Sequence, residues 1–388
     1  MPALFEHPFL DRGFRPFFLL GAIYSVISLL CWAGFYAGYI TPSPILSDFV
    51  SWHAHELIYG FTIAIVAGFL LTAVANWTGG APARQIHLGG LSVLWMAGRA
   101  VMNFDLSFPL WLVYAIEAAF IPALAISLSI PLLKSWSKRN FVFIGLLSVL
   151  FACDVLFLLS ENRIPLYVAL FMIVIMISLI GGRVIPAFTV GALRQKRKKL
   201  YQTDQRKMDV AAVASLAALA LILVFFGSVN AAFSVIAIVS AAIHALRMRH
   251  YHTRHIFHDP MLWILQAGYL WLVIGLLLLG LSGFGLVPFS AALHALTAGA
   301  IGSMTLGMMC RVTLGHTGRD IIASPLTTLS FALMIISGLM RVLGPLLLHQ
   351  YALFWVIGSA CLWAASFGLY IITYLPMLWQ PRPDGTLA

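Results

Sequence analysis

Residues 50–76 read VSWHAHELIYGFTIAIVAGFLLTAVAN, and this stretch decides the class of fold. It carries two imidazoles, His53 and His55, and one carboxylate, Glu56, at its start, and the rest of the run is uncharged. The hydrocarbon core of a bilayer is about 30 Å thick and takes about 20 apolar residues of helix. Because the apolar run is continuous rather than alternating, it predicts a transmembrane helix and not a barrel strand.

The whole chain has the same character. It is 388 residues long, 61% hydrophobic and 9% charged, whereas soluble domains carry roughly 25% charged residues. Windows of about 20 apolar residues predict an all-α, polytopic membrane bundle of about twelve transmembrane helices, with residues 1–388 forming a single transmembrane domain. The expected helices cover 17–38, 50–76, 88–104, 108–130, 141–159, 164–187, 209–227, 230–247, 261–282, 289–312, 324–343 and 351–376.

The basic residues predict the orientation. If the N-terminus is cytoplasmic, all but three of the 23 Lys and Arg residues fall at or near the inner face, and the exceptions are Arg99, Arg163 and Arg341. Basic residues are retained on the cytoplasmic side, so we expect both termini there. The net charge of +10 is then explained by inner loops that face anionic lipid, and it requires no nucleic acid.

This orientation sorts the histidines by depth. His53 and His55 lie at the outer end of one inward-running helix, and His294 in SAALHALTAG lies at a similar depth on another. His316 is 22 residues beyond His294, or about 33 Å of helix, so it belongs to a separate inner site. Imidazole is a usual ligand of heme iron and copper, so the outer histidines predict such a centre. The alternative is that each is an interfacial histidine bonded to a backbone carbonyl.

Two of the histidines share a sequence spacing. His55 and His294 are each followed by glycine at +5 and by Thr-Gly at +23 and +24. Small residues permit close helix approach or a flat macrocycle, so these two could be the axial pair of one heme, and a chance match is the alternative. His53 and His55 point about 200° apart on a helix, so they serve two centres or straddle the helix start.

Charged residues at the same level extend the prediction. Glu56 could orient an imidazole or take a proton, which makes it the candidate catalytic residue. Arg99 and Arg341 could pair with heme propionates, or they could snorkel to the interface. Carboxylates within a membrane are costly, so Glu117 and Asp154 either line a proton route with Glu56 or pair with a donor such as Arg99.

A second polar group gathers at the inner face and includes Arg311 and His316. It could hold a second metal centre or anchor a propionate, with His7 or His87 as a further ligand. The alternative is helix capping and contact with lipid phosphates.

Six motifs, in order along nearly the whole chain, resemble the NnrS family. They are FRPFF (14–18), WHAHELIYGF (52–61), GFLLTAVANWTG (68–79), GGRVIPAFT (181–189), HALTAGAIGSMTLGMMCR (294–311) and GHTGR (315–319). That family consists of bacterial inner-membrane proteins of about twelve helices, associated with denitrification and nitric oxide (nitrosative) stress and described as carrying heme and copper. The resemblance implies heme b and copper, with His53, His55, His294 and His316 as candidate ligands. This chain departs from the family pattern at ILQAGYLW, where Gln266 replaces a histidine.

We therefore expect a multi-pass inner-membrane hemoprotein that also binds copper and acts in nitric oxide response, metabolism or detoxification. If it is an enzyme, it is a heme-copper oxidoreductase for nitric oxide or a related diatomic gas. Its electrons would come from a quinol or cytochrome, because the chain has no CxxCH motif of its own. Two alternatives remain: a copper or heme transporter, and a gas or redox sensor without turnover. Few prolines interrupt the apolar runs, which weighs mildly against transport.

Overall fold

The computed structural model describes residues 7–41, 45–46, 48–195 and 201–385, and in these ranges it contains helices and no strand. The basic run 196–199 lies outside the described residues. The α-helices are α1 (Phe14–Tyr36), α2 (Phe49–His55), α3 (Ile63–Thr78), α4 (Gln85–Asn103), α5 (Leu110–Ala118), α6 (Phe120–Lys134), α7 (Val142–Ser160), α8 (Ile164–Gln195), α9 (Arg206–Phe226), α10 (Ala231–Met248), α11 (Pro260–Gly283), α12 (Phe289–His294), α13 (Gly302–His316), α14 (Pro325–Leu347) and α15 (Ala352–Trp379).

The prediction of an all-helical, multi-pass membrane protein is confirmed. Within the described residues, eleven helical segments are long and apolar enough to cross a bilayer, where the sequence predicted about twelve. The difference is the segment expected at 88–104. Helix α4 has the necessary length, but polar residues that include His87, Arg99 and Asn103 lower its hydropathy. The orientation of the termini stays a prediction.

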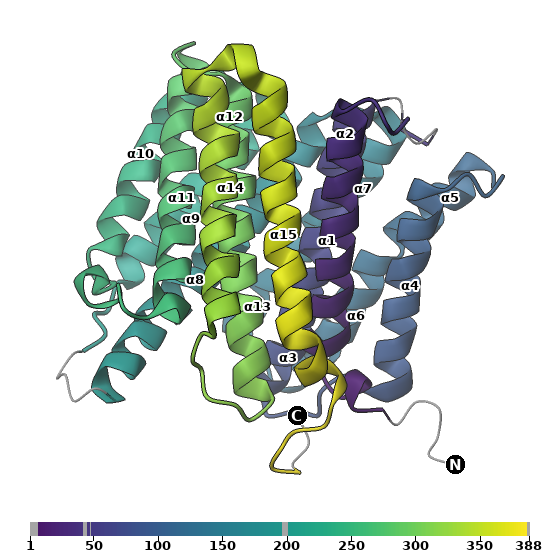
Figure 1. Cartoon of the computed structure of the whole chain (residues 1–388), viewed down its shortest axis with the longest axis vertical. Coiled ribbons are helices and arrows are strands. Elements are labelled where there is room, and N and C mark those ends of the chain that lie inside the picture. The colour runs from purple at the N-terminus through teal and green to yellow at the C-terminus, as the bar shows by residue number, and fades with distance from the viewer. Residues whose placement is uncertain (1–6, 42–44, 47, 196–200, 386–388) are drawn as a thin grey trace. The chain divides into compact units, whose positions relative to one another are not determined.

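Figure 1 labels these helices along the chain. The chain groups into two compact units. Unit 1 comprises residues 1–169, 309–321 and 370–388, and unit 2 comprises residues 170–308 and 322–369. The WHAHE stretch belongs to unit 1, and His294 belongs to unit 2. That the two act as a single domain remains a prediction.

The FRPFF motif forms the first turn of α1 and anchors unit 1. Phe14, Phe17 and Phe18 are each 0% exposed. The backbone N–H of Phe14 donates to the hydroxyl of Thr72 on α3 at 3.1 Å. This bond supplies a partner for one of the N–H groups that a helix leaves unsatisfied at its start, so the motif fixes α1 against α3.

The side chain of Arg15, in the same motif, caps the C-terminal end of another helix, α15. Its guanidinium is fully buried, and Nη1 donates to the carbonyls of Leu378 at 2.9 Å and Gln380 at 2.7 Å, at the C-terminal end of α15. The last carbonyls of a helix have no partner within the helix, and a cation there also complements the helix dipole. Arg15 therefore joins the start of α1 to the end of α15 within unit 1.

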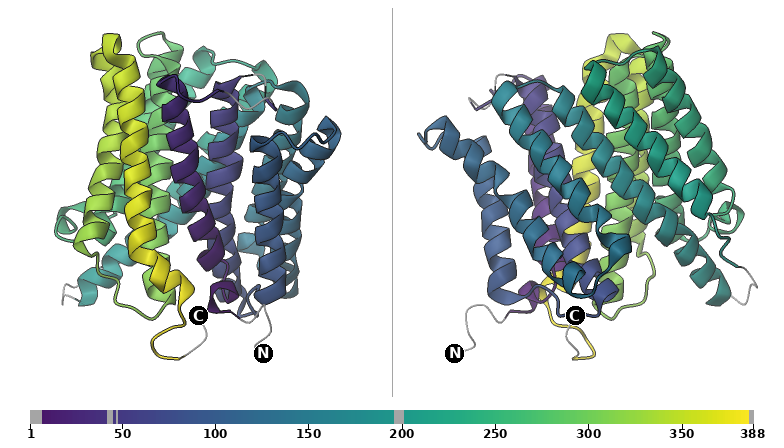
Figure 2. Two further views of the ribbon diagram at one scale, coloured as in Figure 1. Left: turned by 45° about the vertical axis from the view of Figure 1, so that its right-hand side comes forward. Right: turned by 180° about the vertical axis from the view of Figure 1, so that it is seen from behind.

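One membrane-spanning segment, Leu110–Lys134, is broken into α5 and α6 at Ala119. Pro122 follows three residues later. Proline lacks an N–H, and its ring clashes with the carbonyl four residues earlier, here that of Ala118, the last residue of α5. Figure 2 shows the resulting change of direction at α5.

His55 and His294, the two histidines that share a sequence spacing, are each followed by a π-helix of seven residues. The segment η2 (Glu56–Thr62) begins directly after His55, and η5 (Ala295–Ile301) begins directly after His294. π-Helical turns are rare overall, and those that do occur are often found at functional sites. The spacing that the two stretches share in sequence therefore corresponds to the same local backbone structure in each.

The outer faces of the helices carry large apolar side chains. Ile27 is 52% exposed, Val93 61%, Ile126 64% and Leu156 57%. In water, an apolar surface of this extent would promote aggregation. In a bilayer the same side chains contact acyl chains, so the exposed surface agrees with the membrane location of these helices.

We expect Arg15→Met to destabilise the protein, because it leaves the carbonyls at the end of α15 unpaired. A hydrogen bond to a charged group contributes about 1.5–3 kcal/mol, so the free energy of unfolding should fall by about 2 kcal/mol or more. Thermal unfolding of detergent-purified protein measures this loss. Arg139→Met removes an exposed arginine and is the control; equal midpoints for the two variants would contradict the capping role.

Candidate metal and proton site

His55 lies at the centre of a buried ionic cluster in unit 1. Its Nδ1 is 2.8 Å from Oε1 of Glu56, and its Nε2 is 3.0 Å from Oδ1 of Asp154 and 3.8 Å from Oε1 of Glu117. All four side chains are at most 2% exposed. The carboxylates come from the start of η2, from α5 and from α7, so three separate elements converge on one imidazole.

Arg99 on α4 bridges two of these carboxylates. Its Nη1 donates to Oε2 of Glu56 at 2.6 Å, and its Nη2 forms an ion pair with Oε1 of Glu117. The Arg99 side chain is 8% exposed. The cluster therefore contains three carboxylates, one guanidinium and one imidazole, all removed from lipid. We call these five residues the His55 cluster.

A second layer of hydrogen bonds holds Glu56. The hydroxyl of Tyr24 donates to its Oε2, and Nδ2 of Asn103 donates to the same oxygen at 3.2 Å and to the Tyr24 hydroxyl at 2.9 Å. Nε1 of Trp52 in turn donates to Oδ1 of Asn103 at 3.0 Å. Tyr24 and Asn103 were not predicted from the sequence, because neutral side chains in apolar runs carry no charge signal. One signal was present: Arg99 and Asn103 are four residues apart and so share a helix face.

An N-cap fixes the start of α2, the helix that ends at His55. The Asp48 carboxylate accepts the Ser51 N–H at 2.8 Å and the Ser51 hydroxyl at 2.6 Å. Nη2 of Arg163 lies 2.9 Å from Asp48. Burial alone would raise the pKa of Asp48, but the bonds from Ser51 and Arg163 outweigh it and hold that pKa below its usual range. Asp48 therefore stays ionised, as an N-cap at a helix dipole requires.

The π-helix and two aromatic rings set the position of the imidazole. The Thr62 hydroxyl donates to the carbonyl of Leu57, five residues back, at 2.7 Å, which matches the wider turn. The rings of Tyr59 and Phe157 lie 5.0 and 5.5 Å from the His55 ring, measured between centroids. The imidazole is thus held by aromatic contacts on its sides and by carboxylates at both nitrogens.

Gly98 makes room for Glu117. A Cβ at this position would lie 2.7 Å from Oε2 of Glu117, closer than real Cβ contacts come. That oxygen is buried and has no hydrogen-bond partner within the described residues. A buried polar atom without a partner is costly. Oε2 of Glu117 is therefore the atom in the His55 cluster that a bound cation would satisfy.

His53 points away from this cluster. It is half-buried, and its ring stacks on Trp32 of α1 with the centroids 4.0 Å apart and the planes at 20°. Within unit 1, the structure therefore does not bring His53 and His55 to one centre. This agrees with their two-residue separation on a helix.

His294 has a different environment in unit 2. Its Nδ1 lies 2.6 Å from the carbonyl oxygen of Ser290, so Nδ1 carries the proton and Nε2 is the basic nitrogen. Arg341 is half-buried on α14, a helix that packs against both α12 and η5. Because His294 and His55 belong to separate units, their pairing across one heme remains a prediction.

The residues of the predicted inner site have other contacts in the structure, and a second metal centre there stays a prediction. Among the described residues, the group of three His, Cys, Asp or Glu side chains close enough to share an ion is that of His55, Glu117 and Asp154. The His316 ring lies 5.7 Å from that of Phe14, and its carbonyl accepts Nη1 of Arg382 at 3.2 Å. Two other residues of the predicted inner site, His7 and Arg311, also lie outside that group. The ring centroids of His7 and Trp379 are 4.7 Å apart, and Arg311 is half-buried on α13.

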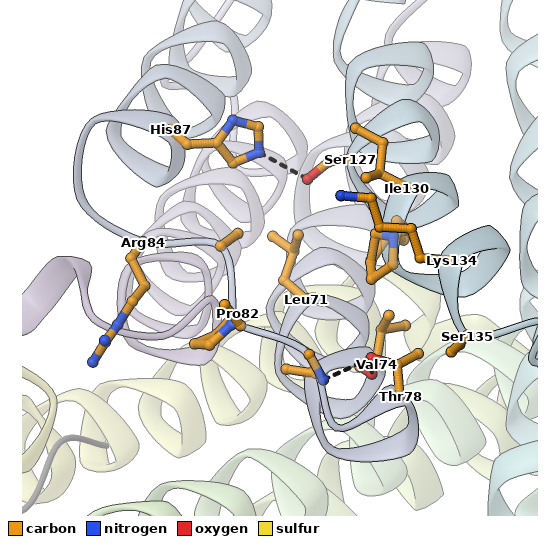
Figure 3. A pocket seen from close by; sticks show the side chains of 16 residues that line it. Leu71, Val74, Thr78, Pro82, Arg84, His87, Ser127, Ile130, Lys134 and Ser135 are labelled. Atoms are coloured by element: carbon orange, nitrogen blue, oxygen red, sulfur yellow. Dashed lines mark hydrogen bonds between the residues drawn. The ribbon is translucent and has the colours of Figure 1, made fainter.

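His87 lines a cavity in the same unit. The cavity has a volume of about 660 Å³ and lies between the ends of α3, α4 and α6. Figure 3 shows His87 facing Ser127, with Nε2 2.8 Å from the hydroxyl oxygen, and Lys134 on the α6 side. Arg84 turns away, and its Nε donates to the carbonyl of Asp11 at 3.2 Å. The hydrogen-bond partner of His87 is thus a serine.

Unit 2 contains a buried polar network that the sequence analysis did not single out. Arg247 is 1% exposed, and its Nε and Nη2 lie 2.8 and 2.5 Å from Oδ1 of Asp209. Its Nη1 donates to the Ser178 carbonyl at 2.9 Å and to the Tyr269 hydroxyl at 2.8 Å, which also lies 2.8 Å from Nδ1 of His244. The sequence contained one signal for this network: the acidic Asp209 lies in the first turn of α9, and the basic Arg247 lies in the last turn of α10.

Gln266, the departure from the family pattern, is also buried in unit 2. Its Nε2 donates to the hydroxyl of Thr189 at 3.2 Å and to the carbonyl of Tyr251 at 2.9 Å. In this chain the side chain therefore links α8, α11 and the segment after α10 by hydrogen bonds.

We expect Arg99→Met to be strongly destabilising, because it leaves Glu56 and Glu117 as uncompensated buried charges. Breaking a buried ion pair on one side costs about 3–5 kcal/mol. The double variant Arg99→Met/Glu117→Gln should recover part of the loss, since it removes one of the two carboxylates. Thermal unfolding midpoints of the three proteins measure this.

Arg163→Met breaks a half-exposed pair with Asp48 and serves as the matched control. It should cost no more than about 1 kcal/mol. An Arg99→Met protein as stable as Arg163→Met would mean that the His55 cluster holds no net negative charge for Arg99 to balance.

A comparison with known families gives one result for nearly the whole chain. The family model described as NnrS protein matches residues 8–382. No curated protein matches the chain. The matched range includes the whole His55 cluster and both π-helices.

Proposed function

The chain belongs to the NnrS family, and we propose that it is a bacterial inner-membrane metalloprotein that binds a copper or iron ion at the His55 cluster and acts on nitric oxide. Family membership supports a membrane protein associated with the response to nitric oxide. The metal, its ligands and the chemistry are our proposal, and they rest on the charge and geometry of the cluster.

The observation that carries the proposal is a charge imbalance. Glu56, Glu117 and Asp154 supply three negative charges when ionised, and Arg99 supplies one positive charge. With a neutral imidazole at His55, the sum is 3 negative minus 1 positive, or a net −2. Ionisable groups within a membrane persist when they are paired. A divalent metal ion neutralises a charge of −2 and leaves His55 in the neutral form that binds metals.

The donor atoms fit a small cation. One ligand atom from each of His55, Glu117 and Asp154 lies within 4.8 Å of the others. Bonds of about 2.0–2.2 Å from imidazole or carboxylate to a metal put opposite ligands about 4.2 Å apart. Nε2 of His55 lies 3.0 Å from Oδ1 of Asp154 and 3.8 Å from Oε1 of Glu117, so the side chains need to open slightly to admit an ion. A mixed nitrogen and oxygen set suits oxidised copper or ferrous iron, whereas reduced copper prefers sulfur. A copper or iron ion bound there would offer an open coordination position to a diatomic ligand.

The chain's own residues have separate roles in this proposal. Glu56 accepts hydrogen bonds from Tyr24, Asn103 and Arg99 on one oxygen and faces Nδ1 of His55 with the other. It therefore orients the imidazole so that Nε2 points at Asp154 and Glu117, as outer-shell carboxylates do at metal sites. Of the two roles predicted for Glu56, this geometry favours positioning the imidazole.

Of the two histidines that the sequence suggested as a heme pair, the geometry supports His294 and not His55. Both nitrogens of His55 face carboxylates, and His55 is fully buried, so a macrocycle could not reach it without displacing Asp154. His294 donates through Nδ1 to the Ser290 carbonyl, which is the arrangement common for metal-bound histidine. We therefore assign heme b to His294, with Arg341 as the candidate partner of a propionate.

Retention of the ion distinguishes this proposal from a transporter of copper or heme. The ligand side chains are at most 2% exposed, so an ion held there is enclosed and not in passage. A sensor would share the same site without turnover. Consumption of nitric oxide by purified protein, with a reduced quinol or cytochrome as electron donor, separates an oxidoreductase from a sensor.

We predict that the purified protein retains about one copper or iron ion in the His55 cluster, and that Asp154→Asn and Glu117→Gln lose it. Glu56→Gln should weaken metal affinity by about 10–100-fold, as removal of an outer-shell partner does. Metal analysis of detergent-purified protein measures both effects, with the exposed Asp105→Asn as control. Equal metal content in Asp154→Asn and Asp105→Asn would overturn the assignment of the site.

Heme retention is predicted to depend on His294. His294→Ala should lower heme content, read from the reduced absorption spectrum, while membrane insertion persists. His55→Ala should change metal content and leave heme in place, and His316→Ala and His53→Ala should affect neither the heme spectrum nor the ion at His55. Loss of heme from His55→Ala together with full heme in His294→Ala would reverse the two assignments.

A further inference from the structure

A cavity of about 410 Å³ adjoins the His55 cluster on its α4 side. Three residues of its lining, Tyr24, Arg99 and Asn103, are the same ones that surround Glu56. The remaining lining is mostly apolar or aromatic and includes Trp52 and Trp95, with Ser28 and Cys31 on α1 as the exceptions. The cavity thus has a polar wall, which is the outer layer of the His55 cluster, and walls suited to an apolar ligand.

The mouth of the cavity faces the region where lipid lies. Four of its lining residues are substantially exposed: Ile23 at 38%, Ile27 at 52%, Met96 at 42% and Phe104 at 66%. Ile23 and Ile27 lie on α1, Met96 lies within α4 and Phe104 directly follows it, and all four are apolar. A ligand would therefore enter from the bilayer, and any tail it carries would remain among acyl chains.

The polar wall favours a ligand that can form hydrogen bonds, which an acyl chain cannot. Arg99 is 8% exposed, and its Nε–H is buried without a hydrogen-bond partner within the described residues. Asn103 and Tyr24 are joined to each other and to Glu56. A hydrocarbon chain leaves the Arg99 Nε–H without an acceptor, whereas a ligand with ring oxygens offers acceptors at that wall.

We propose that this cavity binds the ring of a membrane quinone or quinol. The rings of Tyr24 and Trp95 lie 5.6 Å apart at 86°, which gives a flat ring aromatic contact on two sides. A ring oxygen at the polar wall would be linked through Asn103 or Tyr24 to Glu56, and through Glu56 to Nδ1 of His55. The volume lies within the range of about 300–1,000 Å³ of small-molecule sites. Only the link to a metal at His55 rests on the proposed function.

Tryptophan fluorescence tests the binding directly, because Trp52 and Trp95 line the cavity. The detergent-purified protein is titrated with a short-chain ubiquinone analogue, which quenches nearby indoles. Ala100→Phe fills the cavity from α4, and Ala97→Phe on the same helix, outside the lining, is the matched control. We expect Ala100→Phe to raise the dissociation constant about tenfold or more, a change of about 1.4 kcal/mol, and Ala97→Phe to leave it unchanged. Equal quenching curves for the two variants would overturn the proposal.

A second arm tests the alternative occupant. A phospholipid brominated on its acyl chain quenches indoles in contact with lipid. Because the quinone analogue also quenches, the readout is the extra quenching that brominated lipid adds over unbrominated lipid at saturating analogue, which should shrink in the wild type but not in Ala100→Phe. Extra bromolipid quenching that saturating analogue does not reduce would assign the cavity to an acyl chain. Asn103→Leu should weaken quinone binding and leave the apolar walls, and so bromolipid quenching of Trp95, intact; it also removes the bonds of Asn103 to Glu56 and Trp52. Unchanged quinone affinity would count against the hydrogen-bonded ring.

Metal analysis on the same samples separates this proposal from the proposed function. Quinone binding that depends on Ala100 in a protein without metal would keep the cavity assignment and remove the metal centre. Metal retained in all variants, with the same quinone affinity in Ala100→Phe and Ala97→Phe, would keep the metal centre and remove the cavity assignment.

Discussion

A carboxylate inside a bilayer persists only where a cation, a proton or a metal ion neutralises it, and the His55 cluster contains three carboxylates. Arg99 balances one charge through its contacts with Glu56 and Glu117. The remaining imbalance is the reason that we propose a site there and not only an internal ion pair. Two protons on these groups would also neutralise it, so the cluster is by its charge either a metal centre or a proton store.

The residues around the cluster fix the positions of its side chains. Asp48 sets where α2 begins, and the π-helix after His55 sets how the chain continues. Gly98 gives the carboxylate of Glu117 its space. α4, the helix too polar to count as a span, is the one that delivers Arg99 and Asn103. Its low hydropathy is therefore a consequence of serving the site, since local exceptions to a sequence rule concentrate at functional positions.

Much of this architecture follows from sequence. The long apolar runs predict the helices because a bilayer leaves the backbone few alternatives, and the cost of charge in lipid singled out Glu56, Glu117 and Asp154. What sequence could not supply was their convergence on His55, since helix packing brings α5 and α7 to that imidazole. For the same reason His55 read as a free heme ligand, whereas carboxylates occupy both of its nitrogens. The break at Ala119 was foreshadowed by Pro122, but Tyr24 and Asn103 carried no comparable signal.

X-ray absorption spectroscopy of the His294→Ala protein, at the edge of whichever of copper or iron it retains, tests the central claim most directly. The proposal expects that variant to lose the heme that would otherwise dominate an iron spectrum. The account predicts a first shell of mixed nitrogen and oxygen at about 2.0–2.2 Å with the scattering of a single imidazole. A sulfur ligand, a porphyrin shell of four nitrogens, or the absence of any bound metal would contradict it.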